Sequence, residues 1–136
     1  MTPDLARETL MEALITGWEA ASGPTHFISG YREPDMTRQK TAFAIFEVDL
    51  PRVEQSAMHG NAPPKRYYGE VCIDIFAPAN SGLKTLFDMQ EIIENCLTVR
   101  TISAITLYGM SVRKRTTAIG WMGRHLTILY QFDSIS

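Results

Sequence analysis

The sequence predicts an α+β fold, a mostly antiparallel sheet with two helices packed on one face. An alternating strand begins at Tyr67, stops at Ala77-Pro78 and passes through Asn80-Ser81-Gly82 into an amphipathic helix that ends near Leu97. Two further alternating segments end the chain, and their short connection favours an antiparallel pair. At 136 residues the chain is long enough to bury one core. Residues 1–136 are therefore expected to form a single domain.

The first helix is predicted over residues 2–21. Thr2 can cap this helix, and Pro3 suits its first position, where no backbone N–H is needed. Ser22-Gly23-Pro24 is expected to end it. One apolar stripe at helical spacing predicts the buried face, and it consists of Leu10, Met11, Leu14, Ile15 and Trp18.

The segment after this helix is polar and broken, so we expect irregular structure over residues 25–40, around a short strand at 26–29. Residues 42–49 have the β-branched and aromatic content of a strand, and Pro51 is expected to end it. Residues 52–66 then carry Ser, Gly, Asn and Pro residues. Loops this long are uncommon in compact domains unless they bind or gate something, so a long functional loop is predicted there.

In the strand from Tyr67, Val71, Ile73 and Ile75 point to one face of the sheet. Ser81 is the expected cap of the second helix. Phe87 falls outside the apolar stripe of that helix and is either a residue on the margin of the core or a contact to another subunit. The last strands are expected at 102–113 and 121–132. In the second of them Leu126, Ile128, Tyr130 and Phe132 face one way, and the residues that alternate with them face the other.

Composition argues against several classes of protein. The net charge is −2 and the calculated pI is about 5.9, whereas a bulk nucleic-acid binder normally carries a large basic excess. Acidic residues predominate before residue 61 and basic residues after it. No signal peptide or membrane-spanning run is expected, which predicts a protein made in a reducing cytosol. Cys72 and Cys96 occupy apolar positions and are expected to be buried free thiols, rather than a disulfide or a nucleophile.

No spacing of residues indicates a catalytic, cofactor or metal site. His26, His59 and His125 lie far apart, with no close metal-ligand spacing. Gly120 to Gly123 precede a strand and lack the lysine of a phosphate loop. Glu70 and Asp74 are about 13 Å apart along one strand, so a solvated face is expected rather than a carboxylate pair.

Arg113-Lys114-Arg115 is the chain's basic triplet, with Tyr108 and Trp121 near it in sequence. This pattern is compatible with nucleic-acid binding. At the end of a strand, however, three basic residues more often form a solvated hairpin tip that resists aggregation. Such a tip can touch DNA or an acidic protein surface without making the domain a dedicated DNA binder.

Several features together resemble one family. A first helix and a strand are followed by a polar loop ending in Lys65-Arg66-Tyr67-Tyr68-Gly69, then by the strand at 70–78 and by Gly82 opening a helix. This order is similar to that of the tail terminator and tail completion proteins of long-tailed bacteriophages. The resemblance covers most of the chain, but its motifs are structural rather than catalytic, and residues 25–40 match no family feature.

The resemblance implies a non-enzymatic virion protein that forms a ring, commonly a hexamer, which ends the tail tube and later joins it to the head-tail connector. Expected partners are other copies of the chain, the tail tube protein and the connector protein, with passing contact to genomic DNA. The protein is expected in the virion tail, and in the host cytoplasm during assembly. Candidate interface residues are Arg52, Met58, His59, Lys65, Arg66, Phe87, Arg113, Lys114 and Arg115.

Two alternatives stay open from the sequence. One is a head-closure or connector component of the same virion, which shares the ring and differs in what it contacts. The other is a small ligand-binding or enzymatic α+β domain. In that alternative, a pocket between the sheet and the helices uses His125 or Tyr130 as its polar groups.

Overall fold

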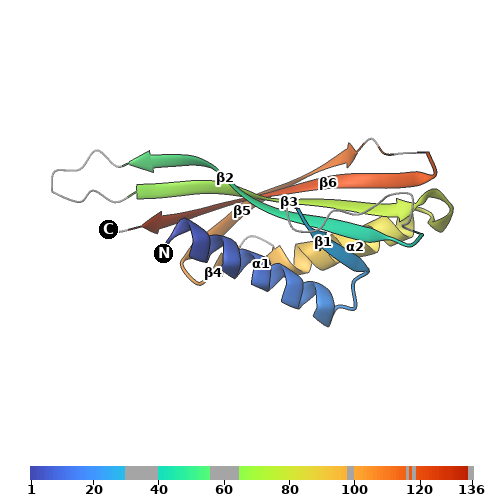
Figure 1. Cartoon of the computed structure of the whole chain (residues 1–136), viewed down its shortest axis with the longest axis horizontal. Coiled ribbons are helices and arrows are strands. Elements are labelled where there is room, and N and C mark those ends of the chain that lie inside the picture. Colours follow the sequence, from blue (N-terminus) through green and yellow to red (C-terminus); the bar gives the residue numbers. More distant parts are fainter. Residues whose placement is uncertain (30–39, 56–64, 98–99, 116, 118, 135–136) are drawn as a thin grey trace.

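The computed structural model describes residues 1–29, 40–55, 65–97, 100–115, 117 and 119–134 (Figure 1). Among these residues, two α-helices and six strands follow one another in the predicted order, with one unpredicted short strand at an edge of the sheet. The elements are α1 (Pro3–Ala20), β1 (Thr25–Ile28), β2 (Phe43–Gln55), β3 (Lys65–Pro78), a 3-10 turn at Ala79–Ser81, α2 (Leu83–Leu97), β4 (Arg100–Ile102), β5 (Ile105–Arg115) and β6 (Trp121–Ser134).

The six strands form one sheet in the order β1-β2-β3-β6-β5-β4. All neighbouring strands are antiparallel except β1, which runs parallel to β2. The sheet is built on the long pair β3 and β6, which stay in register from Lys65 opposite Ser134 to Pro78 opposite Trp121. The mostly antiparallel sheet of the prediction is therefore confirmed.

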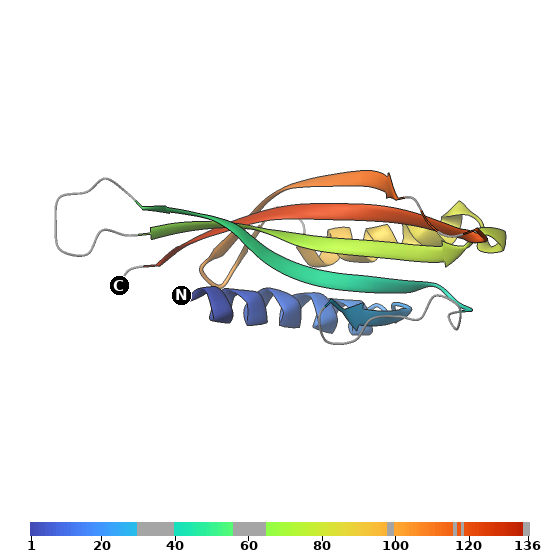
Figure 2. The same ribbon diagram turned by 45° about the horizontal axis from the view of Figure 1, so that its top comes forward.

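Both helices pack on the same face of this sheet, as predicted (Figure 2). Alternation along the strands sends one row of side chains to the helices, and this row is apolar. The core lies between these two layers. Its fully buried side chains include Leu10, Leu14, Trp18, Phe46, Ile73, Ile75, Leu86, Met89, Ile93, Leu97, Leu126 and Ile128.

The first helix begins and ends where the sequence predicts. The Thr2 hydroxyl accepts a hydrogen bond from the Leu5 N–H at 3.2 Å, which satisfies one of the N–H groups that a helix start leaves unpaired. At the other end, the Gly23 N–H donates to the Trp18 carbonyl at 2.9 Å, so the chain turns immediately towards β1. Thr25–Ile28 then forms the short strand expected after that turn.

Three predicted boundaries are wrong. β2 does not end at Pro51 but continues to Gln55 through a register irregularity between Asp49 and Arg52. A proline is tolerated there because it lies within this irregularity, where Leu50 and Pro51 have no partner residue among the described residues of β3. Both ends of the loop predicted at 52–66 therefore belong to strands, residues 52–55 to β2 and residues 65–66 to β3.

The other two corrections concern the second half of the chain. Ser81 does not cap α2, because it lies in the 3-10 turn and the helix begins at Leu83, after Gly82 with φ 78°. The strand predicted at 102–113 is instead the hairpin β4–β5 over residues 100–115, which turns at Ser103 with φ 56°. A left-handed conformation at a serine carries no local sequence signature, so the turn was missed.

Candidate interaction surface

The face of the sheet turned away from the two helices is the richest in charged and aromatic side chains. We call it the outer face. The strand registers align its side chains in rows across β2, β3, β6 and β5. One row runs Glu47, Cys72, Thr127 and Ser111, and the next runs Ile45, Asp74, His125 and Arg113. The solvated face expected around Glu70 and Asp74 corresponds to this surface.

Charge on the outer face is divided between its two halves. Five carboxylates lie on β2 and β3, and they are Glu47, Asp49, Glu54, Glu70 and Asp74, whereas Arg52, Lys65 and Arg66 lie at the far ends of the same strands. Arg113 and Arg115 lie on β5, with His125 beside them on β6. Asp49, Glu47, Arg113 and Arg115 are exposed, whereas the residues along the middle are half-buried. The outer face is therefore mainly acidic on β2 and β3 and basic on β5.

Asp74 joins the two halves. Its Oδ1 atom lies 2.6 Å from Nδ1 of His125 and 3.3 Å from Nη1 of Arg115. The Asp74 side chain is only 18% exposed, so this arrangement is better shielded from solvent than an ordinary surface ion pair. The contact fixes the end of β5 against β3 across the intervening strand.

An aromatic cluster closes one end of the outer face. Phe43 and Phe76 are stacked with ring centroids 4.9 Å apart, and Trp121 meets Phe43 edge-on at 5.4 Å. The guanidinium of Arg115 lies 5.6 Å from the Phe76 ring centroid. Together with Phe27 these rings form a second, smaller buried cluster. Sequence analysis missed it because its members come from four different strands.

Cys72 lies inside the acidic half and is half-buried, so the expectation of a buried thiol is wrong for this residue. Its thiol is 3.9 Å from Oε2 of Glu70. Partial burial, followed by the nearby carboxylates of Glu70, Glu47, Asp49 and Asp74, raises its pKa to about 11. Both cysteines are free, as predicted, and Cys96 is buried between the helices against Gly17.

The raised pKa of Cys72 predicts that its thiol reacts slowly with an alkylating agent. With a pKa of about 11, about 0.1% of Cys72 is thiolate at pH 8, against about 10% at an ordinary pKa near 9. In a Cys96→Ser variant, alkylation by iodoacetamide at pH 8 should be about 100-fold slower than in a model peptide and should rise with pH up to about 11. Mass spectrometry of quenched samples measures the rate. A rate equal to that of the peptide would contradict the electrostatic account.

The arm formed by the far ends of β2, β3 and β6 projects beyond the helices (Figures 1 and 2). Three candidate interface residues belong to it, but they lie in strands instead of a loop. Arg66 donates from Nε to Oδ1 of Asp133 at 2.8 Å, and this lowers the pKa of that carboxyl. Arg52 lies over the Tyr68 ring at 4.3 Å. Lys65 is exposed at the start of β3.

The remaining candidates are distributed over three places. Met58 and His59 lie outside the described residues. Phe87 is 48% exposed on α2, and the Arg124 guanidinium lies 4.9 Å from its ring centroid. The basic triplet Arg113–Arg115 is exposed and forms the last three residues of β5. The strand registers bring Arg113 and Arg115 to the outer face, whereas Lys114 points to the opposite face of the sheet.

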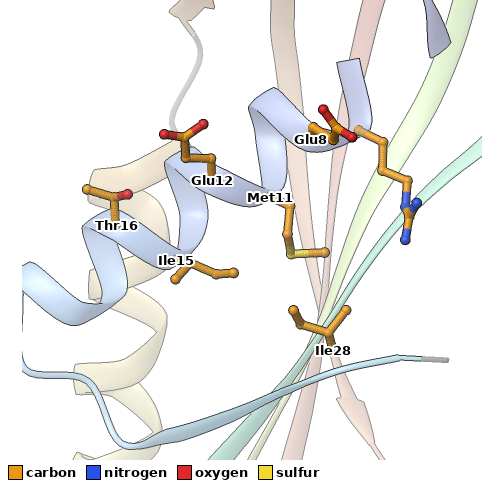
Figure 3. A pocket seen from close by; sticks show the side chains of 7 residues that line it. Glu8, Met11, Glu12, Ile15, Thr16 and Ile28 are labelled. Atoms are coloured by element: carbon orange, nitrogen blue, oxygen red, sulfur yellow. The ribbon is translucent and has the colours of Figure 1, made fainter. Parts of the chain in front are cut away.

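A separate groove of about 400 Å³ lies between α1 and β1 (Figure 3). Met11 and Ile15 point from the helix towards Ile28 of the strand, and polar side chains form its rim. This is not the pocket that the sequence suggested. His125 lies on the outer face, and the Tyr130 hydroxyl is buried and donates to the Asp49 carbonyl at 2.9 Å.

Within the described part of the chain, no group of three or more His, Cys, Asp or Glu side chains is placed to hold a metal ion. Neither of its helices combines the length and the apolar character needed to cross a membrane.

Comparison with known proteins identifies a fold and no family. No family model matches the chain, and no curated protein matches it. A solved structure whose name states no function is similar, with a TM-score of 0.67 and 12% sequence identity. The match covers 97% of this chain and 96% of that one. At this identity the likeness concerns the arrangement of helices and strands alone.

Proposed function

We propose that this protein is a structural, non-enzymatic component of a long-tailed bacteriophage that forms a ring ending the tail tube and joining it to the head connector. The observation that carries the proposal is the division of the outer face into an acidic half on β2 and β3 and a basic half on β5. A surface of this kind complements a second copy of itself placed head to tail. Head-to-tail contacts generate closed rings when the rotation between copies closes.

Two other observations support this function. The element order matches the order on which the resemblance to tail terminator proteins rests. The arm of β2, β3 and β6 extends beyond the helix layer, where it is accessible to a neighbouring subunit, the tail tube protein or the connector protein. In this proposal the protein resides in the virion tail, and in the host cytoplasm during assembly, with the basic triplet available for passing contact with genomic DNA.

The raised pKa of Cys72 gives no support to a thiol enzyme, because a protonated thiol is a weak nucleophile. A head-closure component remains the closest alternative, since it needs the same ring. The groove between α1 and β1 favours a second candidate, a ligand-binding domain, because its floor is apolar and its rim polar.

The test is the mass and shape of the purified protein. Light scattering over a concentration series should give a discrete oligomer of about six subunits, and negative-stain images should show closed rings with a central channel. Raising the salt concentration should weaken the oligomer, because exposed charges are screened. A protein that stays monomeric at every concentration, and is stabilised by a small apolar ligand in a thermal-shift screen, would replace the ring with the ligand-binding candidate.

A further inference from the structure

Two long stretches of sheet edge have no partner strand among the described residues. β1 pairs with β2 only over Phe43–Phe46, and β4 pairs with β5 only over Ile105–Leu107. On the side away from the sheet, residues 47–55 of β2 and residues 108–115 of β5 therefore have no strand partner in the described part of the chain, although on β2 Pro51 has no N–H and the Leu50 N–H donates to Oδ1 of Asp49 at 2.9 Å. We call these stretches the β2 edge and the β5 edge. They are similar in length, and an uncovered edge is a template for pairing with another chain.

The two edges carry opposite charge. The β2 edge carries Glu47, Asp49 and Glu54 with one compensating Arg52, whereas the β5 edge carries Arg113, Lys114 and Arg115 with no acidic residue. Like charges directly opposite across a strand pair are destabilising, and opposite charges are stabilising. Each edge therefore repels a second copy of itself and attracts the other edge. This selects a head-to-tail contact over a two-fold symmetric dimer.

We propose that the β5 edge of one copy pairs with the β2 edge of the next copy, so that their sheets join into one antiparallel sheet. The proposal rests on the proposed ring and names the contact that builds it. Three successive antiparallel pairings separate β2 from β5 within the chain, so these two strands run in opposite directions. A neighbour related by rotation about an axis near the strand direction keeps this relation, and the new pair is antiparallel.

The pleat of the strands fixes the register of this contact. Glu47 and Asp49 point to the outer face, and so do Arg113 and Arg115. Pairing Arg115 with Glu47 and Arg113 with Asp49 satisfies both charges while the helices of the two copies stay on the same side. A slip by one residue would turn each pair to opposite faces of the sheet.

The same register also matches apolar side chains on the helix-facing side. Val112 then lies opposite Leu50, and both residues are half-buried beside the core of their own chain. When the two edges pair, the exposed parts of the Val112 and Leu50 side chains are buried against one another. The contact thus combines a charged row on one face with an apolar continuation of the core on the other.

This register displaces neighbouring copies along the strands. Within one chain Arg113 is level with Ile45, because Ile45 pairs with Asp74, Asp74 with His125 and His125 with Arg113. Moving Arg113 opposite Asp49 shifts the neighbour by about four residues, or roughly 13 Å. A ring can absorb such a shift if its strands tilt from the ring axis, as the strands of a closed barrel do.

Charge exchange between the two edges tests the contact. Variant A carries Arg113→Glu and Arg115→Glu, and variant B carries Glu47→Lys and Asp49→Lys, so that both charge pairs of the proposed register are exchanged. Each variant alone has two edges of the same sign, so its apparent dissociation constant for self-assembly should rise at least about 100-fold. Mixed in equal amounts, A and B should assemble again in alternation, because every β5 edge then meets a β2 edge of opposite charge.

Light scattering and native mass spectrometry measure the assemblies, and the restored species should contain equal numbers of A and B. The matched control is Lys84→Glu with Asp88→Lys, which exchanges an exposed ion pair on α2 and should assemble as the unaltered protein does. Circular dichroism verifies that all variants are folded. Wild-type assembly by A or B alone, or a mixture of folded variants that stays monomeric, would overturn the edge contact.

Oxidative cross-linking of cysteines placed on the two edges tests the register. The native Cys72 is first replaced by serine. Asp49→Cys with Arg113→Cys should give a ladder of covalently linked chains on oxidation, because directly opposite residues lie within disulfide reach. Asp49→Cys with Lys114→Cys is the control, since these side chains point to opposite faces. Equal cross-linking of the two pairs, or assembly without cross-linking of the first, would overturn the register.

The outcomes separate the edge contact from the ring function. Rings that ignore the charge exchange would overturn the edge contact and leave the ring in place. Open filaments that follow the charge exchange would support the edge contact and overturn the ring. An unaltered protein that remains monomeric at every concentration would overturn both.

Discussion

Replacing Trp18 with alanine is expected to lower the free energy of unfolding by about 3–5 kcal/mol, the usual cost of deleting a large buried aromatic side chain. Trp18 is 1% exposed and lies in the core between α1 and the sheet. Its ring meets that of Phe46 edge-on, with centroids 5.3 Å apart. Such pairs add to the energy of area burial.

The indole also holds the turn that leads from α1 to β1. Its Nε1–H donates to the Pro24 carbonyl at 2.6 Å, and a Cβ atom on Gly23 would lie 2.5 Å from the ring. The turn therefore packs directly on the indole face. Loss of Trp18 should loosen the docking of β1 as well as create a cavity.

Chemical denaturation followed by far-UV circular dichroism measures this effect. Trp18→Phe is the matched variant, because it keeps a ring in the core and removes the donor to Pro24. We expect it to cost about 1–2 kcal/mol, the range for one lost buried hydrogen bond with its acceptor left unsatisfied. An alanine variant no less stable than the phenylalanine variant would contradict the packing role of the indole.

The helices and the faces of the long strands were predictable because local periodicity records which side is buried. Leu10, Leu14 and Trp18 repeat at helical spacing, and all three are buried. Val71, Ile73 and Ile75 alternate, and they form one core-facing row as predicted. Buried side chains impose these patterns directly on neighbouring positions in the sequence, so no long-range information is needed.

The surface was predictable only in part, because it depends on register between distant strands. The basic triplet was identified from sequence as a hairpin tip. Its link to Asp74, and the pairing of Asp74 with His125 across 51 positions, follow from which residues of β3, β6 and β5 come to lie opposite one another. The continuation of β2 past Pro51 was missed for a related reason. A proline is compatible with a strand at an irregularity of the ladder or at an uncovered edge, and both depend on how the strands of the sheet pair.

Gly69 marks another feature that only the paired strands explain. It lies directly opposite Tyr130, and the phenol ring covers the space that a side chain would need. The Tyr130 hydroxyl then reaches the Asp49 carbonyl on β2 at 2.9 Å, beside the register irregularity of that strand. Burial raises the pKa of Tyr130 to about 12, so the phenol stays protonated and can donate at neutral pH. Gly69 thus leaves room for the Tyr130 ring on β6, so that the Tyr130 hydroxyl reaches over β3 and binds the backbone of β2.

Gly69→Ala is expected to cost about 1–3 kcal/mol, as overpacking of a core usually does. A Cβ atom at this position would lie 2.1 Å from Cζ of Tyr130 and 2.3 Å from its hydroxyl oxygen, so the ring must leave its place. Denaturant unfolding of Gly69→Ala, Tyr130→Leu and the double variant measures the coupling. The double variant should be clearly more stable than the sum of the single losses predicts, because leucine leaves room for the alanine.

Additive losses in that cycle would show that alanine acts through the backbone instead of through the ring. Tyr130→Phe provides the hydroxyl control, and it should cost about 1 kcal/mol by removing the donor to Asp49 alone. Because Asp49 belongs to the β2 edge, the same substitution should also weaken assembly under conditions where the variant remains fully folded. Weaker assembly in Tyr130→Phe, with far-UV circular dichroism unchanged, would link the buried tyrosine to the geometry of the edge that we propose receives the next subunit.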